Sequence, residues 1–558
     1  MERRIRLLVF FFVACFLAII GKLFYWQVIN REYLLALADN QHNVSLGIPA
    51  SRGKIFSSDN FPLVLNQKSY ILFIDPQELK ISPNDLVQKI KSIIKKEQFD
   101  LEAIANKNLR RLVLAKNLDS GVKEELEKLK IEGLDFEEKE KRFYPESSMS
   151  AHLLGFVGED EKGEGKGYFG LEGYYNNEIE GKHGGRSFEQ DALGRPVPLS
   201  EESVEKPIPG RSLVLNLDRP LQFLAEKRLQ EGIKKYSASS GLVVIMDPKT
   251  GGILSMASFP TYDQSAYYLY DSELYRNPVI SSSFEPGSIF KVFVMAAGID
   301  SGKIKVDDIC DACGGPKKIG EYTIKTWNEK YYPNSSMTDV IIHSDNVGMV
   351  YAGQKLGFEK LYDYLKNFGF GQRTGIDLQG EITPELRNRN DWREIDLATA
   401  SFGQGIAATP IQILAAVSAI ANKGELYQPQ VVNKIFEDPH VVEIKPIKKG
   451  RPISAKTAGI ITEMMIQAVE KGEAKWARPQ GWRIAGKTGT AQIPIAGHYD
   501  PEKTVASFIG FAPADNPDFV MLVALREPKT SPWGSETAAP LWFEIAKDIF
   551  KLWRIPPG

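Results

Sequence analysis

Cysteine and histidine are scarce in this chain of 558 residues, which has three cysteines and six histidines. The histidines form no H-E-x-x-H or similar cluster, which argues against a metalloenzyme. Cys15 lies in an apolar N-terminal segment, and Cys310 and Cys313 lack a second pair of Cys or His ligands at a zinc-binding spacing. We therefore expect no metal and no cofactor. Whether Cys310 and Cys313 form a local disulfide or stay as thiols is left open.

Excess charge of either sign is also absent. The 69 Lys and Arg residues nearly balance the 71 Asp and Glu residues, which gives a formal net charge of −2 and no sign of nucleic-acid binding. One basic cluster, at 445–451, is short and interrupted by proline, which favours a solvated loop. The content of 43% hydrophobic and 25% charged residues is typical of globular protein. The chain is too long for one domain.

Only one long apolar run is present, at residues 7–28, and no second run of comparable length follows. At 1.5 Å per residue it can cross a hydrocarbon core of about 30 Å. The arginines at positions 3, 4 and 6 predict that the first residues stay inside. A cleaved signal peptide would have a shorter apolar region followed by small residues, whereas Phe24-Tyr25-Trp26 follows here. We predict a cytoplasmic tail at 1–6, an uncleaved anchor at 7–28 and an extracytoplasmic remainder.

Residues 285–291 contain the first candidate for chemistry, because Glu285-Pro286-Gly287-Ser288-Ile289-Phe290-Lys291 runs directly into an apolar segment at 292–297. The Pro-Gly break predicts that Ser288 lies in the first turn of a buried helix, with Lys291 one turn on and on the same face. A serine hydroxyl needs an adjacent base at neutral pH, and a lysine serves only if burial keeps it neutral. Ser288 and Lys291 are thus a candidate nucleophile and base.

Two further motifs lie downstream of Ser288. Ser344-Asp345-Asn346 interrupts an apolar helical stretch, and Lys487-Thr488-Gly489-Thr490 lies within a predicted strand. S-x-x-K, S-D-N and K-T-G together are the signature of class A β-lactamases and penicillin-binding proteins. Each short pattern also occurs elsewhere, and at Lys249-Thr250-Gly251 a hairpin turn is the better interpretation. The other repeats of the patterns begin at Ser51, Ser58, Ser92, Ser120 and Ser203.

The surroundings of the three motifs resemble the transpeptidase domain of class B penicillin-binding proteins, from about Gly210 to the C-terminus. The segments that carry this resemblance are 276–279, 284–288, 374–378, 401–405, 409–412 and 507–513. The residues around Arg276-Asn277 and Glu285-Pro286-Gly287, and the Asn in Ser344-Asp345-Asn346, look more like the septal, cell-division type (FtsI-like) than the elongation type.

The upstream half resembles the non-catalytic pedestal of the same family at 52–56, 142–145, 152–155, 170–172 and Gly181. One turn departs from the pattern. The family usually continues after its Arg-Gly with an Asp-Arg-Asn-Gly-like turn, whereas this chain has Ser57-Ser58-Asp59-Asn60-Phe61-Pro62. We predict a pedestal (dimerisation-type) domain at 29–207 and a transpeptidase domain at 208–558.

The predicted fold class is α+β. Strands are expected at 241–246, 253–257, 483–492, 505–511 and 519–526, with helical stretches between them, which favours a single antiparallel sheet with helices on both sides. The resemblance implies the same serine β-lactamase-like fold for this domain. It is preceded by an extended α/β pedestal and a single N-terminal transmembrane helix.

The resemblance also implies roles for the site residues. Ser288 would be the acylated nucleophile and Lys291 its base. Ser344 would pass protons, and Asn346 would contact the surroundings of Lys291 and the acyl amide. Lys487, Thr488 and Thr490 would bind a terminal carboxylate, and Gly489 would let the substrate approach the sheet edge. The backbone N–H groups of Ser288 and Thr490 would stabilise the oxyanion.

These roles imply a peptidoglycan D,D-transpeptidase that acylates itself on the D-Ala-D-Ala end of a stem peptide, releases D-alanine and cross-links to a neighbouring amine. The implied ligands and partners are stem peptides, β-lactams, the bacterial cytoplasmic membrane, a SEDS-family glycan polymerase and proteins of the division or elongation complex. The alternatives are an elongation-type enzyme, a β-lactamase or D,D-carboxypeptidase, and a non-catalytic scaffold or sensor.

Overall fold

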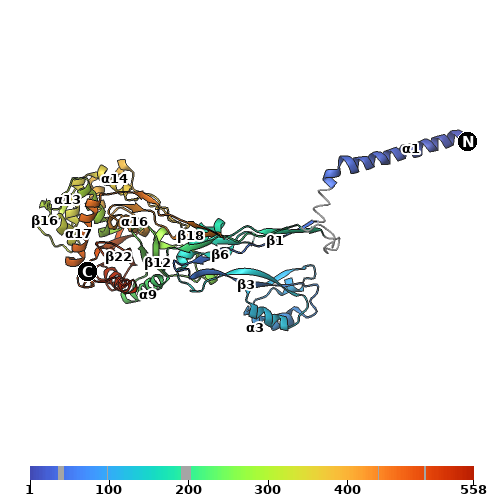
Figure 1. Ribbon diagram of the computed structural model, residues 1–558, viewed down its shortest axis with the longest axis horizontal. Coiled ribbons are helices and arrows are strands. Elements are labelled where there is room, and N and C mark those ends of the chain that lie inside the picture. Colours follow the sequence, from blue (N-terminus) through green and yellow to red (C-terminus); the bar gives the residue numbers. More distant parts are fainter. Residues whose placement is uncertain are drawn as a thin grey trace. The chain divides into compact units, whose positions relative to one another are not determined.

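The structure of the protein is a computed structural model that describes residues 1–34, 43–96, 98–161, 163–189, 203–437, 439–495 and 498–557 (Figure 1). Two stretches of the predicted pedestal range, 35–42 and 190–202, lie outside the described residues. The chain divides into two compact units. Unit 1 comprises residues 1–52 and 180–210, and unit 2 comprises residues 53–179 and 211–558.

Unit 1 begins with the apolar helix α1 (Glu2–Phe24), which continues as the π-helical turn η1 (Tyr25–Ile29). The 28 residues from Glu2 to Ile29 form a helix long and apolar enough to cross a membrane, and none of its most apolar window is buried. At 1.5 Å per residue they span about 42 Å. The unit also contains a three-stranded antiparallel sheet in the order β1-β8-β9. Its strands are β1 (Asn43–Ile48), β8 (Gly184–Glu189) and β9 (Ser203–Glu205).

Unit 2 contains a seven-stranded sheet with the order β19-β18-β10-β2-β3-β4, in which β5 also pairs with β3. β10 pairs in parallel with β2 and antiparallel with β18, so strands from residues 55–143 and from residues 212–443 share one sheet. The strands are β2 (Ile55–Phe56), β3 (Pro62–Ile74), β4 (Leu112–Leu118), β5 (Leu134–Phe143), β10 (Ser212–Leu215), β18 (Val432–Glu437) and β19 (His440–Glu443).

Three short helices share a small core with the β3–β4–β5 part of this sheet. Leu86 and Ile90 of α3 (Pro83–Ile94) and Leu126 of α5 (Ser120–Lys128) are buried with Leu72 and Leu114 of the strands. α4 (Leu101–Ala105) adds Ile104 to the same cluster. Side chains at a helical spacing therefore close one face of the twisted strands.

Three of the pedestal segments meet in one buried ion pair. Arg142 and Glu172 are 6% and 0% exposed and lie 2.8 Å apart. The Arg142 guanidinium also donates to Gly53 O at 2.8 Å and to Asn66 Oδ1 at 2.6 Å. Because a buried charge without partners is costly, these contacts offset the cost of burying the pair. The motifs at 52–56, 142–145 and 170–172 thus form one structural junction.

The second sheet of unit 2 has five antiparallel strands in the order β12-β11-β23-β22-β21. The strands are β11 (Ser240–Met246), β12 (Ile253–Phe259), β21 (Ala485–Ile495), β22 (His498–Ala512) and β23 (Phe519–Arg526). The predicted strands and the single antiparallel sheet are confirmed. β21 and β22 pair beyond their predicted inner ends, out to Ile495 and His498, so the hairpin is longer than the apolar pattern indicated.

Both faces of this sheet are buried, because alternate residues enter two different cores. Val243 and Ile245 of β11 pack in the core with α9 (Arg219–Tyr236) and α18 (Ala538–Leu552). Val244 and Met246 of the same strand pack on the opposite face, in the core with α16 (Pro410–Ala421) and α17 (Ala455–Lys471). The alternation follows from the two-residue period of a strand.

The remaining elements of unit 2 are short or lie in the helical region around α11. The helices are α6 (Ala151–Leu154), α7 (Gly170–Tyr174), α8 (Asn176–Ile179), α10 (Pro278–Ser281), α11 (Lys291–Asp300), α12 (Met337–Ile342), α13 (Asn346–Leu356), α14 (Phe358–Asn367) and α15 (Glu394–Ala400). The 3₁₀ turns are η2 (Gln264–Leu269), η3 (Ser272–Tyr275), η4 (Gly287–Phe290), η5 (Asp311–Gly314) and η6 (Arg389–Asp391). The short strands are β6 (Phe156–Glu159), β7 (Gly165–Tyr168), β13 (Ile309–Cys310), β14 (Lys317–Ile319), β15 (Tyr322–Ile324), β16 (Ser335–Ser336), β17 (Leu426–Tyr427) and β20 (Lys448–Gly450).

Candidate active site

The turn that carries Ser288 precedes a buried helix, as the sequence predicts, but it is a 3₁₀ turn. Ser288 lies in η4, and α11 begins only at Lys291. Gly287 has φ +54°, and a Cβ added there would lie 2.8 Å from the carbonyl oxygen of Thr490. Only glycine fits such a position. The Ser288 turn is therefore held directly against β21 at Thr490.

Lys291 is fully buried, at 0% exposure, and its side-chain nitrogen has three acceptors within hydrogen-bond distance. Nζ donates to Ser344 O at 2.5 Å, to Asn346 Oδ1 at 2.8 Å and to Ser344 Oγ at 3.2 Å. Burial, and then the charge of Lys487, hold the pKa of Lys291 well below its usual value. Among the described residues, Ser288 is not an acceptor of this group, so the predicted contact of nucleophile and base is not made here.

The Ser344-Asp345-Asn346 segment is the tight connection between α12 and α13, as the interrupted apolar stretch predicts. Ser344 has φ +54°, a conformation that is sparsely populated for residues other than glycine. Asp345 caps α13, because its carboxylate accepts from the N–H groups of Val347 at 2.8 Å and Gly348 at 3.2 Å. The side chains of Ser344 and Asn346 then reach Lys291 together.

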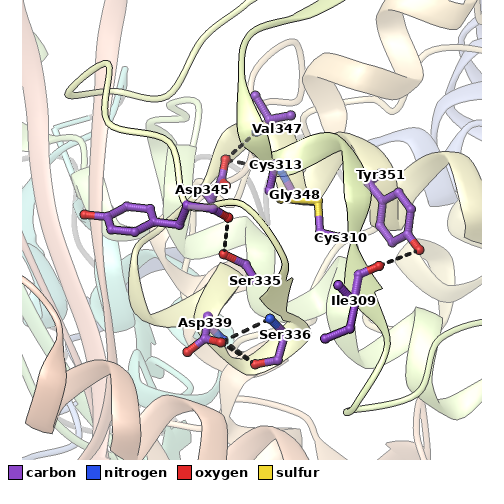
Figure 2. Close-up of a disulfide and its surroundings, with 11 residues drawn as sticks. Ile309, Cys310, Cys313, Ser335, Ser336, Asp339, Asp345, Val347, Gly348 and Tyr351 are labelled. Atoms are coloured by element: carbon purple, nitrogen blue, oxygen red, sulfur yellow. Dashed lines mark hydrogen bonds between the residues drawn. A yellow bond between two sulfur atoms is a disulfide. The ribbon is translucent and has the colours of Figure 1, made fainter.

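A disulfide supports the first turn of α13. Cys310 and Cys313 are bonded and both fully buried, which decides between the two alternatives left open for this pair. A Cβ added at Gly348 would lie 3.1 Å from the sulfur of Cys313, so the helix start packs closely on the disulfide (Figure 2). The described residues hold no group of three or more His, Cys, Asp or Glu that could bind a metal ion.

Lys487 approaches Ser344 from the strand side. It lies on β21, is 3% exposed, and donates to Ser344 Oγ at 3.0 Å and to Thr488 Oγ1 at 3.3 Å. Burial lowers the pKa of Lys487 to about 8, and the carboxylate of Glu473 opposes this shift. The hydroxyl of Ser344 therefore lies between two buried amines whose pKa values are both lowered.

The rest of the Lys-Thr-Gly-Thr segment shapes the open side of β21. A Cβ added at Gly489 would collide with the Ser507 hydroxyl and with Ile289 of the nucleophile turn, so the strand approaches that turn closely only because this residue is glycine. Thr490 Oγ1 accepts from the N–H of Gly534 at 2.9 Å. Thr488 and Thr490 are half-buried and lie in the wall of a cleft.

This cleft has a volume of about 250 Å³ and brings five of the eight predicted site residues into one lining. Lys291, Lys487 and Gly489 are buried and lie outside that lining. The lining consists of Gly287, Ser288, Trp327, Ser344, Asn346, Phe402, Gln404, Glu473, Thr488, Thr490, Gln492, Thr504, Pro532 and Trp533.

Several lining residues were not predicted from the sequence. Trp327 follows β15 and Trp533 precedes α18, and their rings meet edge to face with centroids 4.8 Å apart. Glu473 follows α17, and it is the one acidic residue among the described residues that line the cleft. Burial raises the pKa of Glu473, and the charges of Lys487 and Lys291 oppose that shift. No motif pointed to Glu473, whereas the segment 401–405 already contained Phe402 and Gln404.

Comparison with known proteins yields matches over both halves of the chain. The model of the penicillin binding protein transpeptidase domain matches residues 241–551, and that of the penicillin-binding protein dimerisation domain matches residues 47–215. Stage V sporulation protein D of Bacillus subtilis is 33% identical to this chain, and the aligned region covers 100% of this chain and 86% of that protein. Peptidoglycan D,D-transpeptidase FtsI of Escherichia coli K12 is 28% identical over 97% of this chain and 90% of its own length. The crystal structure of penicillin binding protein 2X from Streptococcus thermophilus is 25% identical, with a TM-score of 0.75 over 91% of this chain and 80% of that one.

Proposed function

The chain belongs to the class B penicillin-binding proteins, and we propose that it carries out their D,D-transpeptidase reaction with Ser288 as the acylated nucleophile. The family makes it a serine-type peptidoglycan transpeptidase that binds peptidoglycan and β-lactams. The single observation that supports the residue assignment is the position of the Ser344 hydroxyl, 3.2 Å from Lys291 Nζ and 3.0 Å from Lys487 Nζ.

We assign the acylation step to Ser288 and Lys291. Lys291, kept neutral by burial, accepts the proton of the Ser288 hydroxyl, and Oγ forms a bond to the carbonyl carbon of the penultimate D-alanine. We expect the Ser288 hydroxyl to reach Lys291 when substrate binds, since catalytic hydrogen bonds are often long in free enzymes. The backbone N–H groups of Ser288 and Thr490 stabilise the oxyanion, and the close packing of the Ser288 turn on Thr490 supports this pairing.

Ser344 completes the proton transfers. When the tetrahedral intermediate collapses, the C–N bond to the terminal D-alanine breaks, and its nitrogen takes the proton from Lys291 through the Ser344 hydroxyl. The acceptor amine then attacks the acyl-enzyme, gives its proton back along the same route and forms the new amide, which frees Ser288. Asn346, which accepts from Lys291 at 2.8 Å, holds the base in place and faces the substrate amide.

Lys487, Thr488, Gly489 and Thr490 form the carboxylate side of the site. A protonated Lys487 attracts the terminal carboxylate, and the hydroxyls of Thr488 and Thr490 donate to it. Gly489 leaves the substrate strand room beside β21. These four roles follow the family pattern and agree with the position of the threonines in the cleft wall.

The test of this function is cross-linking by the purified full chain in detergent. It would receive a stem pentapeptide ending in D-Ala-D-Ala and an acceptor stem bearing a free amine. Mass spectrometry should find released D-alanine and the cross-linked dimer with the native enzyme, and neither product with Ser288→Ala. Release of D-alanine without a dimer would identify a carboxypeptidase, and no release by either protein would favour a scaffold.

We further propose the septal role, with a SEDS-family glycan polymerase as partner. The surroundings of Arg276-Asn277 and of Glu285-Pro286-Gly287 support it, as does the likeness to FtsI of Escherichia coli. The test is the position of a fluorescent fusion in dividing cells. A band at midcell supports the septal role, and a signal along the side wall supports the elongation-type alternative.

Membrane placement and domain borders complete the proposal. The arginines at 3, 4 and 6 support an N-terminus inside and a catalytic domain outside the cytoplasmic membrane, with α1 as the anchor. The domain borders that we propose are 1–6 for the cytoplasmic tail, 7–28 for the membrane anchor, 29–207 for the pedestal and 208–558 for the transpeptidase domain. Protease added to intact spheroplasts should digest the transpeptidase domain and spare a tag placed before Met1, and the reverse result would contradict this orientation.

A further inference from the structure

Unit 2 has a second concave site, lined by the end of α14, the loop at 372–374, α16, and the β17–β20 pair. Its volume is about 400 Å³, and we call it the basic pocket. Its described lining includes four basic residues, Lys366, Arg373, Lys449 and Arg451, and no acidic residue. The sequence predicted a solvated loop for the last two, and both are exposed in the structure, where they also line this cavity.

The positive charge of the basic pocket is mostly unneutralised. Within the described part of the chain, Lys366, Arg373 and Lys449 have no carboxylate partner within ion-pair distance. Arg451 pairs with Glu425, which also accepts from Lys448 at 2.8 Å. Three converging cations without counter-charges at a concave site favour an anion there.

A second nearby carboxylate, that of Glu381, is used elsewhere. Its oxygens accept from the N–H and the hydroxyl of Thr374, both at 2.6 Å, and from the N–H of Gly375 at 3.2 Å. These bonds fix the loop that presents Arg373. The carboxylate therefore shapes the rim of the basic pocket, and it is absent from the lining.

Buried side chains, several of them apolar, lie behind the surface of the basic pocket. Phe368, Ala415 and Leu426 are buried there. Gln412 is buried too, and its amide is fixed by bonds to Gln372 O at 2.8 Å and from Thr409 N–H at 3.0 Å. A concave site backed by packed side chains, with polar groups at its rim, is a usual form of a small-molecule site.

We propose that the basic pocket binds a small anionic ligand that carries carboxylate or phosphate groups and lies beside the buried side chains of Phe368 and Leu426. Arginine presents a planar pair of donors that suits either anion, and lysine adds a point charge. The ligand would contact Arg373 and Lys449 at the rim and Lys366 at the end of α14.

The basic pocket is also connected to the nucleophile turn by aromatic packing. The ring of Phe368 lies 5.2 Å from that of Phe293 on α11, and Phe370 lies 5.1 Å from Phe290 and 5.2 Å from Phe293. Phe290 is two residues from Ser288 and adjacent to Lys291. Because buried rings transmit displacement through close packing, a ligand beside Phe368 should change the rate of acylation at Ser288.

The experiment uses the full chain in detergent and two probes, inorganic pyrophosphate and citrate. Calorimetry measures binding without reference to activity, and the rate of labelling by a fluorescent penicillin is measured with and without each probe. The test variant is Arg373→Gln/Lys449→Gln. The matched control is Lys318→Gln/Lys456→Gln, which removes the same charge from two exposed lysines outside the lining.

We expect at least one probe to bind, the test variant to weaken that binding at least about tenfold, and the control variant to leave it unchanged. Binding of pyrophosphate alone points to a phosphate ligand, and binding of citrate alone to a carboxylate ligand. Absence of binding by both probes, or equal loss in both variants, would overturn the site. Binding that leaves the labelling rate unchanged would overturn its connection to Ser288.

Discussion

The pKa of about 8 at Lys487 predicts an alkaline limit for acylation. Substrate and β-lactams carry a carboxylate that needs a protonated Lys487, whereas Lys291 must be neutral to act as base. The pKa of Lys291 lies well below 10.5, so raising the pH only increases its neutral fraction. We therefore expect activity to fall above pH 8 because Lys487 loses its proton.

The size of this effect follows from the titration of one group. With a pKa of about 8, Lys487 is about 90% protonated at pH 7 and about 9% protonated at pH 9. The second-order rate constant for acylation by a fluorescent penicillin should thus fall about tenfold between pH 7 and pH 9. Stopped-flow or timed gel labelling of the full chain from pH 6 to pH 10 measures it, with circular dichroism to check that the fold persists.

Lys487→Arg separates this explanation from a general effect of pH. Arginine stays charged throughout the range, so the variant should lose the alkaline fall even if its rate is lower at every pH. A wild-type rate that is constant from pH 7 to pH 9.5 would refute the reasoning. A fall of the same size in Lys487→Arg would refute it as well, because the titrating group would then lie elsewhere.

Three further predictions concern the neighbours of these lysines. Glu473→Gln removes the carboxylate that stabilises charged Lys487, so the alkaline fall in the acylation rate should move below pH 8. The control variant Glu470→Gln, at an exposed residue of α17, should leave the fall where it is. An unchanged alkaline fall in Glu473→Gln would contradict the electrostatic role of this residue. Ser344→Ala removes the hydroxyl shared by Lys291 and Lys487. Since a hydrogen bond to a charged group contributes about 1.5–3 kcal/mol, acylation should slow on the order of 10- to 100-fold in the same assay. An unchanged rate would exclude the proposed proton route. Cys310→Ala/Cys313→Ala opens a loop of about four residues, which should lower the free energy of unfolding by about 2 kcal/mol in denaturant titration. If reduction of the native protein left the free energy of unfolding unchanged, a supporting role of the disulfide would be contradicted.

The sequence predicted the sheet because its strands carry unbroken apolar runs such as 242–246 and 519–525, which both faces of a covered sheet require. It also predicted that Ser288, Ser344 and Lys487 meet, since the three motifs have a joint meaning that none has alone. The convergence of Lys291 and Lys487 on Ser344 Oγ depends on packing across some 200 residues of chain, so it could only come from the fold.

Other features carry no local signal. Glu473 is an ordinary residue of a Lys-Gly-Glu turn until β21 places Lys487 near it. β10 lies in the range predicted for the transpeptidase domain, yet it pairs with β2 of the predicted pedestal range as well as with β18. Hydrogen-bond partners in a sheet are chosen by tertiary contacts rather than by strand sequence. The basic cluster at 445–451 is exposed, as predicted, but its charge pattern alone does not reveal that Lys449 and Arg451 line a cavity beside Phe368 and Leu426.

The most direct test of the central claim is the fate of a fluorescent penicillin on the purified protein, compared between wild type and Ser288→Ala by gel and by intact mass with peptide mapping. The account predicts a long-lived adduct on the peptide that contains Ser288 and its complete loss in the variant. A stable adduct that persists in Ser288→Ala would contradict the assignment of the nucleophile. A transient adduct with release of hydrolysed penicillin would contradict the transpeptidase and identify a β-lactamase.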